Sequence, residues 1–169
     1  MRLMLLHEIS QFLTLLAETQ QNLLALFEIK RQALDSFQPQ ELMTLSAREE
    51  ELGARLQSLV HERSGLLRKA RDEGFTVTSL MELSGAIEKT VDDVRVLKAI
   101  ELIRARIVQS QKRTVMLQHE SWVHWIIAHR CYNHFTELVD LIAHGGRPAP
   151  TYGDKPTSAT GGALLDAAA

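Results

Sequence analysis

The sequence predicts an all-α protein: an antiparallel bundle of about three long, coiled-coil-like helices, with a short connecting helix and an extended C-terminal tail. Apolar residues recur at helical spacing over long stretches. Only 4 prolines and 9 glycines occur in 169 residues. Aromatic residues make up only 5%, so the core must consist mainly of Leu, Ile, Val and Ala, which suits helix-on-helix packing. We expect one bundle domain, 1–146, followed by a flexible tail, 147–169.

The composition argues against two classes of partner. The net charge is −2, with 19 basic and 21 acidic residues mixed along the chain, so no basic stripe indicates nucleic-acid binding. No apolar run approaches the roughly 20 residues of a membrane span, and the opening "MRLMLLHEIS" is too short for a signal-peptide core. One cysteine, Cys131, excludes an internal disulfide and suits a reducing compartment. We therefore expect a cytoplasmic protein without membrane insertion.

The first expected helix covers residues 3–37. Apolar side chains recur there at helical spacing from Ile9 to Leu34. Pro39 then breaks the pattern, because proline disfavours helix in the residue before it yet suits the first turn of the next helix.

The second expected helix, about 40–73, has the most regular pattern. Nine positions are separated alternately by 3 and 4 residues, which is the period of a left-handed coiled-coil seam. We call them the α-seam: Leu42, Leu45, Glu49, Leu52, Leu56, Leu59, Arg63, Leu66 and Ala70. Two seam positions are charged, Glu49 and Arg63. Gly74 in "DEGFTV" is expected to end this helix.

A short helix is expected at 79–87, where Ser79 and Glu82 have the spacing of a capping box. A second such pair, Thr90 with Asp93, and Gly85 indicate a break before the last helix. That last helix is expected from about 91 to 144. At 1.5 Å per residue it spans roughly 80 Å, against roughly 50 Å for each earlier long helix, so it overhangs its partners unless they are staggered.

The last helix carries an unusually wide apolar face over residues 115–142. With 100° per residue, its apolar side chains cover an arc of roughly 240°, where a surface helix shows a stripe just over 100° wide. The face contains Trp122, Trp125, Ile126, Ala128, Cys131, Tyr132, Phe135, Leu138, Val139 and Ile142. Two explanations stay open: the segment lies centrally between the first two helices, or part of it awaits a helix of another protein.

No constellation of residues indicates catalysis, a metal or another cofactor. His119, His124, His129 and His134 repeat every five residues, but successive members turn 140° around a helix. A zinc site needs about four convergent ligands, and only Glu120–His124 and Cys131–His134 share a face. The glycines of "HGGRPAP" follow a helix instead of opening one, so they do not form a phosphate site. We therefore expect no enzyme, no metal and no cofactor.

The C-terminal segment "GGRPAPTYGDKPTSATGGALLDAAA" has the composition of an extended or disordered chain. Its one aromatic residue is Tyr152. It is either an incidental residue of a plain tail or a handle for a partner, since tyrosine offers large contact area at low entropic cost. The end of the tail could also fold back and cover the apolar face with Leu164 and Leu165.

Taken together, the chain resembles the FlgN family of flagellar type III export chaperones. The resemblance rests on the Leu-rich "LMTLSAREEELGARLQSLVHERSGLL" with its charged seam positions, on "TSLMELSGAI" before the last helix, and on "TYG" in a small-residue tail after it. The sequence departs from the family where Pro156 replaces a second glycine after Tyr152-Gly153. It also has "QHESWVHWIIAHR" where the family's last helix is commonly rich in asparagine.

The resemblance implies a cytoplasmic chaperone that holds the C-terminal helical region of hook-associated proteins, which form the hook–filament junction, until their export. It places Tyr152 and Gly153 where the family docks at the cytoplasmic domain of the export gate. The helical wheel, not a family motif, assigns the client-binding residues: Trp122, Trp125, Ile126, His129 and Tyr132. The alternatives are a helical module that forms homo-oligomers through the wide face, and an adaptor of another secretion system.

Overall fold

The computed structural model describes residues 2–36 and 38–144. In these ranges the chain forms four helices and no strand: α1 (Arg2–Asp35), α2 (Pro39–Asp72), α3 (Leu80–Glu88) and α4 (Val94–Ala143). The prediction of an all-α bundle of long helices with a short connecting helix is confirmed. Every helix begins and ends within three residues of its expected bounds.

The chain divides into two compact units, which are described separately. The first comprises residues 1–121 and the second begins at Trp122. The first unit holds α1, α2, α3 and the part of α4 before Trp122; the second holds the remainder of α4. The predicted tail, 147–169, and the domain boundary before it lie outside the described residues and stay predictions.

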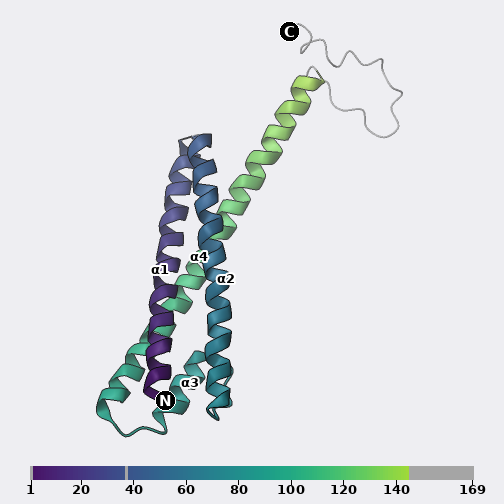
Figure 1. The fold of residues 1–169 in the computed structure, drawn as a ribbon. Coiled ribbons are helices and arrows are strands. Elements are labelled where there is room, and N and C mark those ends of the chain that lie inside the picture. The colour runs from purple at the N-terminus through teal and green to yellow at the C-terminus, as the bar shows by residue number, and fades with distance from the viewer. Residues whose placement is uncertain (1, 37, 145–169) are drawn as a thin grey trace. The chain divides into compact units, whose positions relative to one another are not determined.

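Helices α1 and α2 lie side by side as an antiparallel hairpin (Figure 1). Pro39 occupies the first turn of α2, as its fixed φ predicts. Three ion pairs join the two helices along their length: Lys30–Glu49 at 2.5 Å, Lys69–Glu8 at 2.8 Å and Arg55–Glu18 at 3.6 Å. Because most of these side chains are partly exposed, each pair contributes at most about 1 kcal/mol. They set the register of the hairpin more than its stability.

The main core lies where α1, α2, α3 and the first part of α4 meet. Five of its residues are fully buried, and they come from all four helices: Ile9, Ala70, Leu83, Ile87 and Ile100. A smaller cluster joins Leu23 and Leu26 of α1 to Leu52 of α2. The core is thus aliphatic, as the scarcity of aromatic residues predicts.

The α-seam faces this core. The four buried residues of α2 are Leu52, Leu59, Leu66 and Ala70, and all are seam positions. The two charged seam positions differ: Glu49 is half-buried and pairs with Lys30 of α1, whereas Arg63 is exposed. The heptad pattern therefore predicts the packed face of α2 correctly, with a local opening at Arg63.

Gly74 ends α2 as predicted. Its φ is 92°, in the left-handed region that favours glycine. The Gly74 N–H donates to the Arg71 carbonyl, and the Phe75 N–H donates to the Ala70 carbonyl at 3.0 Å. This pair of bonds is a Schellman motif, which satisfies the last carbonyls of the helix. Phe75 then packs against the main core.

The Ser79 half of the capping box at the start of α3 is confirmed, and the returning bonds from Glu82 reach the preceding residue, Thr78. The Glu82 N–H donates to the Ser79 hydroxyl at 3.1 Å. The Glu82 carboxylate in turn accepts from the N–H and the hydroxyl of Thr78, at 2.8 and 2.9 Å. These bonds fix the direction in which the chain enters α3.

The last helix begins at Val94, three residues later than expected. Asp93 occupies the N-cap position, because its carboxylate accepts from the Arg95 N–H at 2.8 Å. The Thr90 hydroxyl donates to the Ile87 carbonyl at the end of α3. The break before α4 is therefore confirmed, and the spacing of Thr90 and Asp93 predicted its start one turn too early.

Candidate protein-binding face

The second unit presents a row of exposed apolar side chains along α4. Nine side chains are involved, and we call them the aromatic face: Trp122, Trp125, Ile126, Tyr132, Phe135, Leu138, Val139, Ile142 and the imidazole of His129. Trp122 and Trp125 are 65% and 59% exposed, and Tyr132 is 68% exposed. Large apolar side chains in such a row mark interaction sites more often than plain surface.

Three of the predicted residues contact one another. The Trp122 and Trp125 rings lie edge to face, with centroids 5.7 Å apart and an angle of 64° between their planes. The His129 ring stacks on Trp125, with centroids 5.2 Å apart and planes within 5° of parallel. Because residues three and four apart lie on one side of a helix, these rings form a continuous ladder.

Asn133 extends the ladder by one turn. Its side-chain amide lies 3.4 Å from Nε2 of His129, an orienting contact at the long end of hydrogen-bond distances. The ladder therefore constrains the orientations of the two indoles. Such preorganisation lowers the entropy cost of binding.

The other two predicted residues are Ile126, four residues after Trp122, and Tyr132, three residues after His129. Ile126 is 37% exposed and Tyr132 is much more so. On the helical wheel Tyr132 falls between the two sides of the arc, and Ile126 lies near one edge. The structure thus exposes all five predicted client-binding residues, and puts three of them in contact.

Phe135 was not among the five predicted residues, yet it is 67% exposed. The helical wheel carried the signal for it, since it lies within about 40° of the centre of the arc. Leu141 lies on the opposite side of the wheel and is also exposed. It extends the apolar surface beyond the predicted arc, and periodicity alone gave no sign of that.

The two residues predicted to dock at the export gate, Tyr152 and Gly153, lie outside the described residues. The remaining histidines form no cluster in the part of the chain that the structure describes. In residues 2–36 and 38–144, no group of three or more His, Cys, Asp or Glu side chains could hold a metal ion. Within the same ranges, no helix is both long enough and apolar enough to cross a lipid bilayer.

No protein-family model, curated protein or solved structure matches the chain.

Proposed function

We propose that this protein is a cytoplasmic export chaperone of the flagellar type III system. Its clients are the hook-associated proteins, and it holds their C-terminal helical region until export. The observation that carries the proposal is the aromatic face: two tryptophans, a tyrosine and a phenylalanine exposed on one helix. The Leu-rich seam of α2 and the short helix before α4, on which the resemblance to FlgN chaperones rests, support it.

The aromatic face suits an amphipathic helix of a client. Such a helix lays an apolar stripe against a complementary apolar surface, with anchors one turn apart. Tryptophan and tyrosine are enriched among the residues that dominate binding energy, because each buries a large area with few rotatable bonds. The ladder of Trp122, Trp125 and His129 offers such anchors at successive turns.

The energy of the contact is adequate for a reversible chaperone. Tryptophan side chains bury about 150–250 Å² each, at about 25 cal/mol per Å². Two of them alone give about 8–12 kcal/mol of gross stabilisation, before the costs of ordering and of lost translational freedom, which are of similar size. The net affinity therefore depends on the whole face, and the complex can release its client at the export gate.

The tail belongs to the proposal as a second contact. Tyr152 and Gly153 dock at the cytoplasmic domain of the gate while the aromatic face holds the client. The two functions are separable, because one uses α4 and the other uses the tail.

Titration calorimetry tests the proposal. The full chain is titrated with C-terminal fragments of the hook-associated proteins from its own source. Saturable one-to-one binding is expected, weakened at least tenfold by Trp125→Ala, since a central anchor contributes about 2 kcal/mol or more. His134→Ala is the matched control: it is exposed on the same helix and, nine residues after Trp125, lies on the opposite side of the wheel. It should bind as the wild type does, and so should a chain lacking residues 147–169.

A different result identifies the alternative. If the chain is a tight homo-oligomer that dissociates on Trp125→Ala and binds none of the fragments, the aromatic face is a self-association surface and the chaperone function is wrong. Binding to a helical substrate of another secretion system, without binding to hook-associated fragments, makes the protein an adaptor of that system.

A further inference from the structure

A pocket lies in the first unit, at the point where the α-seam opens. Its volume is about 280 Å³, just below the usual range for ligand sites. All four helices contribute to its wall. Eleven residues line it: Phe12, Leu13, Leu16, Arg63, Ser79, Leu80, Met81, Ile107, Ser110, Gln111 and Thr114.

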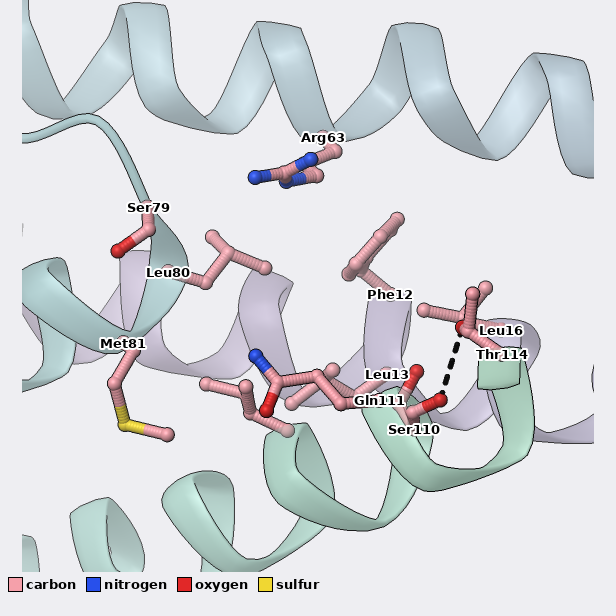
Figure 2. A pocket seen from close by; sticks show the side chains of 11 residues that line it. Phe12, Leu13, Leu16, Arg63, Ser79, Leu80, Met81, Ser110, Gln111 and Thr114 are labelled. Carbon is pink, nitrogen blue, oxygen red and sulfur yellow. Dashed lines mark hydrogen bonds between the residues drawn. The ribbon is translucent and has the colours of Figure 1, made fainter. Parts of the chain in front are cut away.

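The wall of the pocket is mostly apolar and carries one charged side chain. Six of the lining residues are apolar, four are neutral and polar, and one is charged. Arg63 is that one charged residue, and no carboxylate lines the pocket. Figure 2 shows Arg63 approaching from α2 and facing Leu80, Phe12 and Gln111 across the pocket. The pocket therefore combines an apolar wall with a single cation.

Arg63 has no partner within the part of the chain that the structure describes. The other seam charge, Glu49, is paired with Lys30. Arg63 forms no such ion pair or hydrogen bond with residues 2–36 or 38–144. A guanidinium carries five donors suited to a carboxylate, and here they face the pocket unused.

Ser110 provides a second, independent observation. It is more than nine-tenths buried, and it lines the pocket. Its carbonyl accepts from the Gln20 amide at 3.1 Å and from the Thr114 hydroxyl at 3.0 Å. Its own hydroxyl has no hydrogen-bond partner among the described residues. The hydroxyl oxygen is not among the fully buried side-chain atoms that lack a partner, so it is accessible from the pocket and can donate to a ligand there.

The environment of Ser79 is also compatible with an anion. Ser79 is the N-cap of α3, so the positive end of a helix dipole lies at the wall of the pocket. The nearby Glu82 carboxylate does not oppose an incoming anion directly, because it is occupied by the N–H and the hydroxyl of Thr78 and is not part of the wall.

We propose that this pocket is a docking site for a second partner-protein segment, one that carries an acidic side chain one helical turn from a bulky apolar side chain. The apolar side chain enters between Phe12 and Leu80, and the carboxylate pairs with Arg63. Gln111 and the Ser110 hydroxyl supply further donors. This site shares no residue with the aromatic face and does not rest on the identity of the client.

The exposure of Arg63 favours a protein segment over a free small acid. An ion pair at an exposed position is worth little in water, so a small carboxylate gains only weak binding from it. A helical segment adds contacts beyond the pocket. Val60, one turn before Arg63 on α2, is 61% exposed and lies on the side of the helix that such a segment would cover.

Two-dimensional NMR of the full chain tests the charge preference. The probe is 4-phenylbutanoate, which joins an apolar ring to a carboxylate, and 4-phenylbutanamide is its neutral control. The acid should shift the amide signals of Leu80, Ser110 and Gln111 and bind about threefold to fivefold more tightly than the amide, the range expected for one exposed ion pair. Arg63→Gln should abolish that difference.

Arg68→Gln is the matched control variant, since Arg68 is exposed on the same helix and does not line the pocket. It should leave the preference for the acid unchanged. Equal binding of acid and amide to the wild type, or the same loss of preference in both variants, would overturn the assignment of a carboxylate to Arg63.

A second arm decides between a segment and a free acid. The probe is a capped host helix of about 18 residues with Leu and Glu four residues apart, against the same helix with Gln in place of Glu. The Glu helix should bind about tenfold more tightly than 4-phenylbutanoate, and Arg63→Gln should remove its advantage over the Gln helix. If the helix binds no better than the small acid, the pocket is not a docking site for a protein segment.

Discussion

Helix α4 carries apolar residues at helical spacing along its length, but they are buried in its first part and exposed in its second. Before Trp122, its apolar residues at spacings of 3 and 4 are Ile100, Ile103 and Ile107, and all three are buried. From Trp122 onward, the same spacing carries tryptophan, tyrosine and phenylalanine, and these are exposed. The comparison teaches that helical periodicity finds an apolar face, whereas the large aromatic rings occur in the part of α4 that stays exposed, beside aliphatic residues such as Ile126 and Ile142.

The physical reason lies in the size and shape of the side chains. Branched aliphatic residues fill a core at close packing with little entropy loss. Large aromatic rings serve better where a partner must be gripped, because a few of them supply most of the contact area. The core of the first unit is accordingly aliphatic with only one aromatic residue, Phe12, fully in its main cluster.

The largest expected effect comes from comparing two isoleucines of α4. Ile100 is fully buried and Ile142 is 55% exposed. Ile100→Ala should lower the free energy of unfolding by about 2–5 kcal/mol, because it leaves a cavity in the main core. Ile142→Ala should change it by less than about 0.5 kcal/mol, since surface substitutions have small effects. Urea denaturation followed by circular dichroism measures both; equal losses would mean that the two parts of α4 do not differ in this way.

A second comparison sharpens the account of the first unit. Gly74 has a φ of 92°, and Gly53 lies within α2 with nothing within 4 Å of an added Cβ. Gly74→Ala should destabilise by about 1 kcal/mol, because an L-residue is strained in the left-handed region. Gly53→Ala should stabilise by about 0.5–1 kcal/mol through helix propensity. The same denaturation experiment measures both changes. If Gly74→Ala leaves the free energy of unfolding unchanged, the Schellman motif is not the reason that α2 ends at this position.

Much of this fold could be predicted from the sequence. The breaks at Pro39 and Gly74 and the Ser79 cap are local signals, so they survive in the structure. The α-seam predicted each buried residue of α2, because a 3.5-residue period is a direct consequence of packing along one partner. The start of α4 was predicted one turn early, since Thr90 and Asp93 are both good caps and only the fold selects between them.

The site was less predictable. The wheel placed Trp122, Trp125 and His129 on one wide face, but it could not say whether that face was core or surface. The pocket at Arg63 could not be predicted from the sequence, for a different reason. A charged seam position indicates a polar layer in the packing. Whether that charge forms an ion pair, as Glu49 does, or lines a pocket, as Arg63 does, depends on residues of the other three helices. Tertiary contacts of that kind leave no pattern in α2 itself.

The smallest expected effect links the first unit to pH through Glu82. The backbone N–H of Thr78, with the Thr78 hydroxyl and the Ser79 N–H, lowers the pKa of the Glu82 carboxyl below its ordinary value of 4.5. Because the pKa is lower in the folded state, the stabilisation is fully present above the unfolded pKa. It is lost as the pH falls through the folded pKa.

Glu82→Gln should therefore destabilise the protein slightly at ~pH 7 and less at ~pH 3, where the wild-type carboxyl is becoming protonated as well. Urea midpoints of the two proteins at both pH values measure this. Glu137→Gln, on the exposed surface of the second unit, is the control and should show no such pH-dependent difference. If Glu82→Gln lowers the urea midpoint equally at both pH values, the charge of the carboxylate does not stabilise the start of α3. The hydrogen-bond geometry of the capping side chain would then be the stabilising feature. In that case acid would not loosen α3 through this group, and Leu80 would keep its place in the wall of the pocket at low pH.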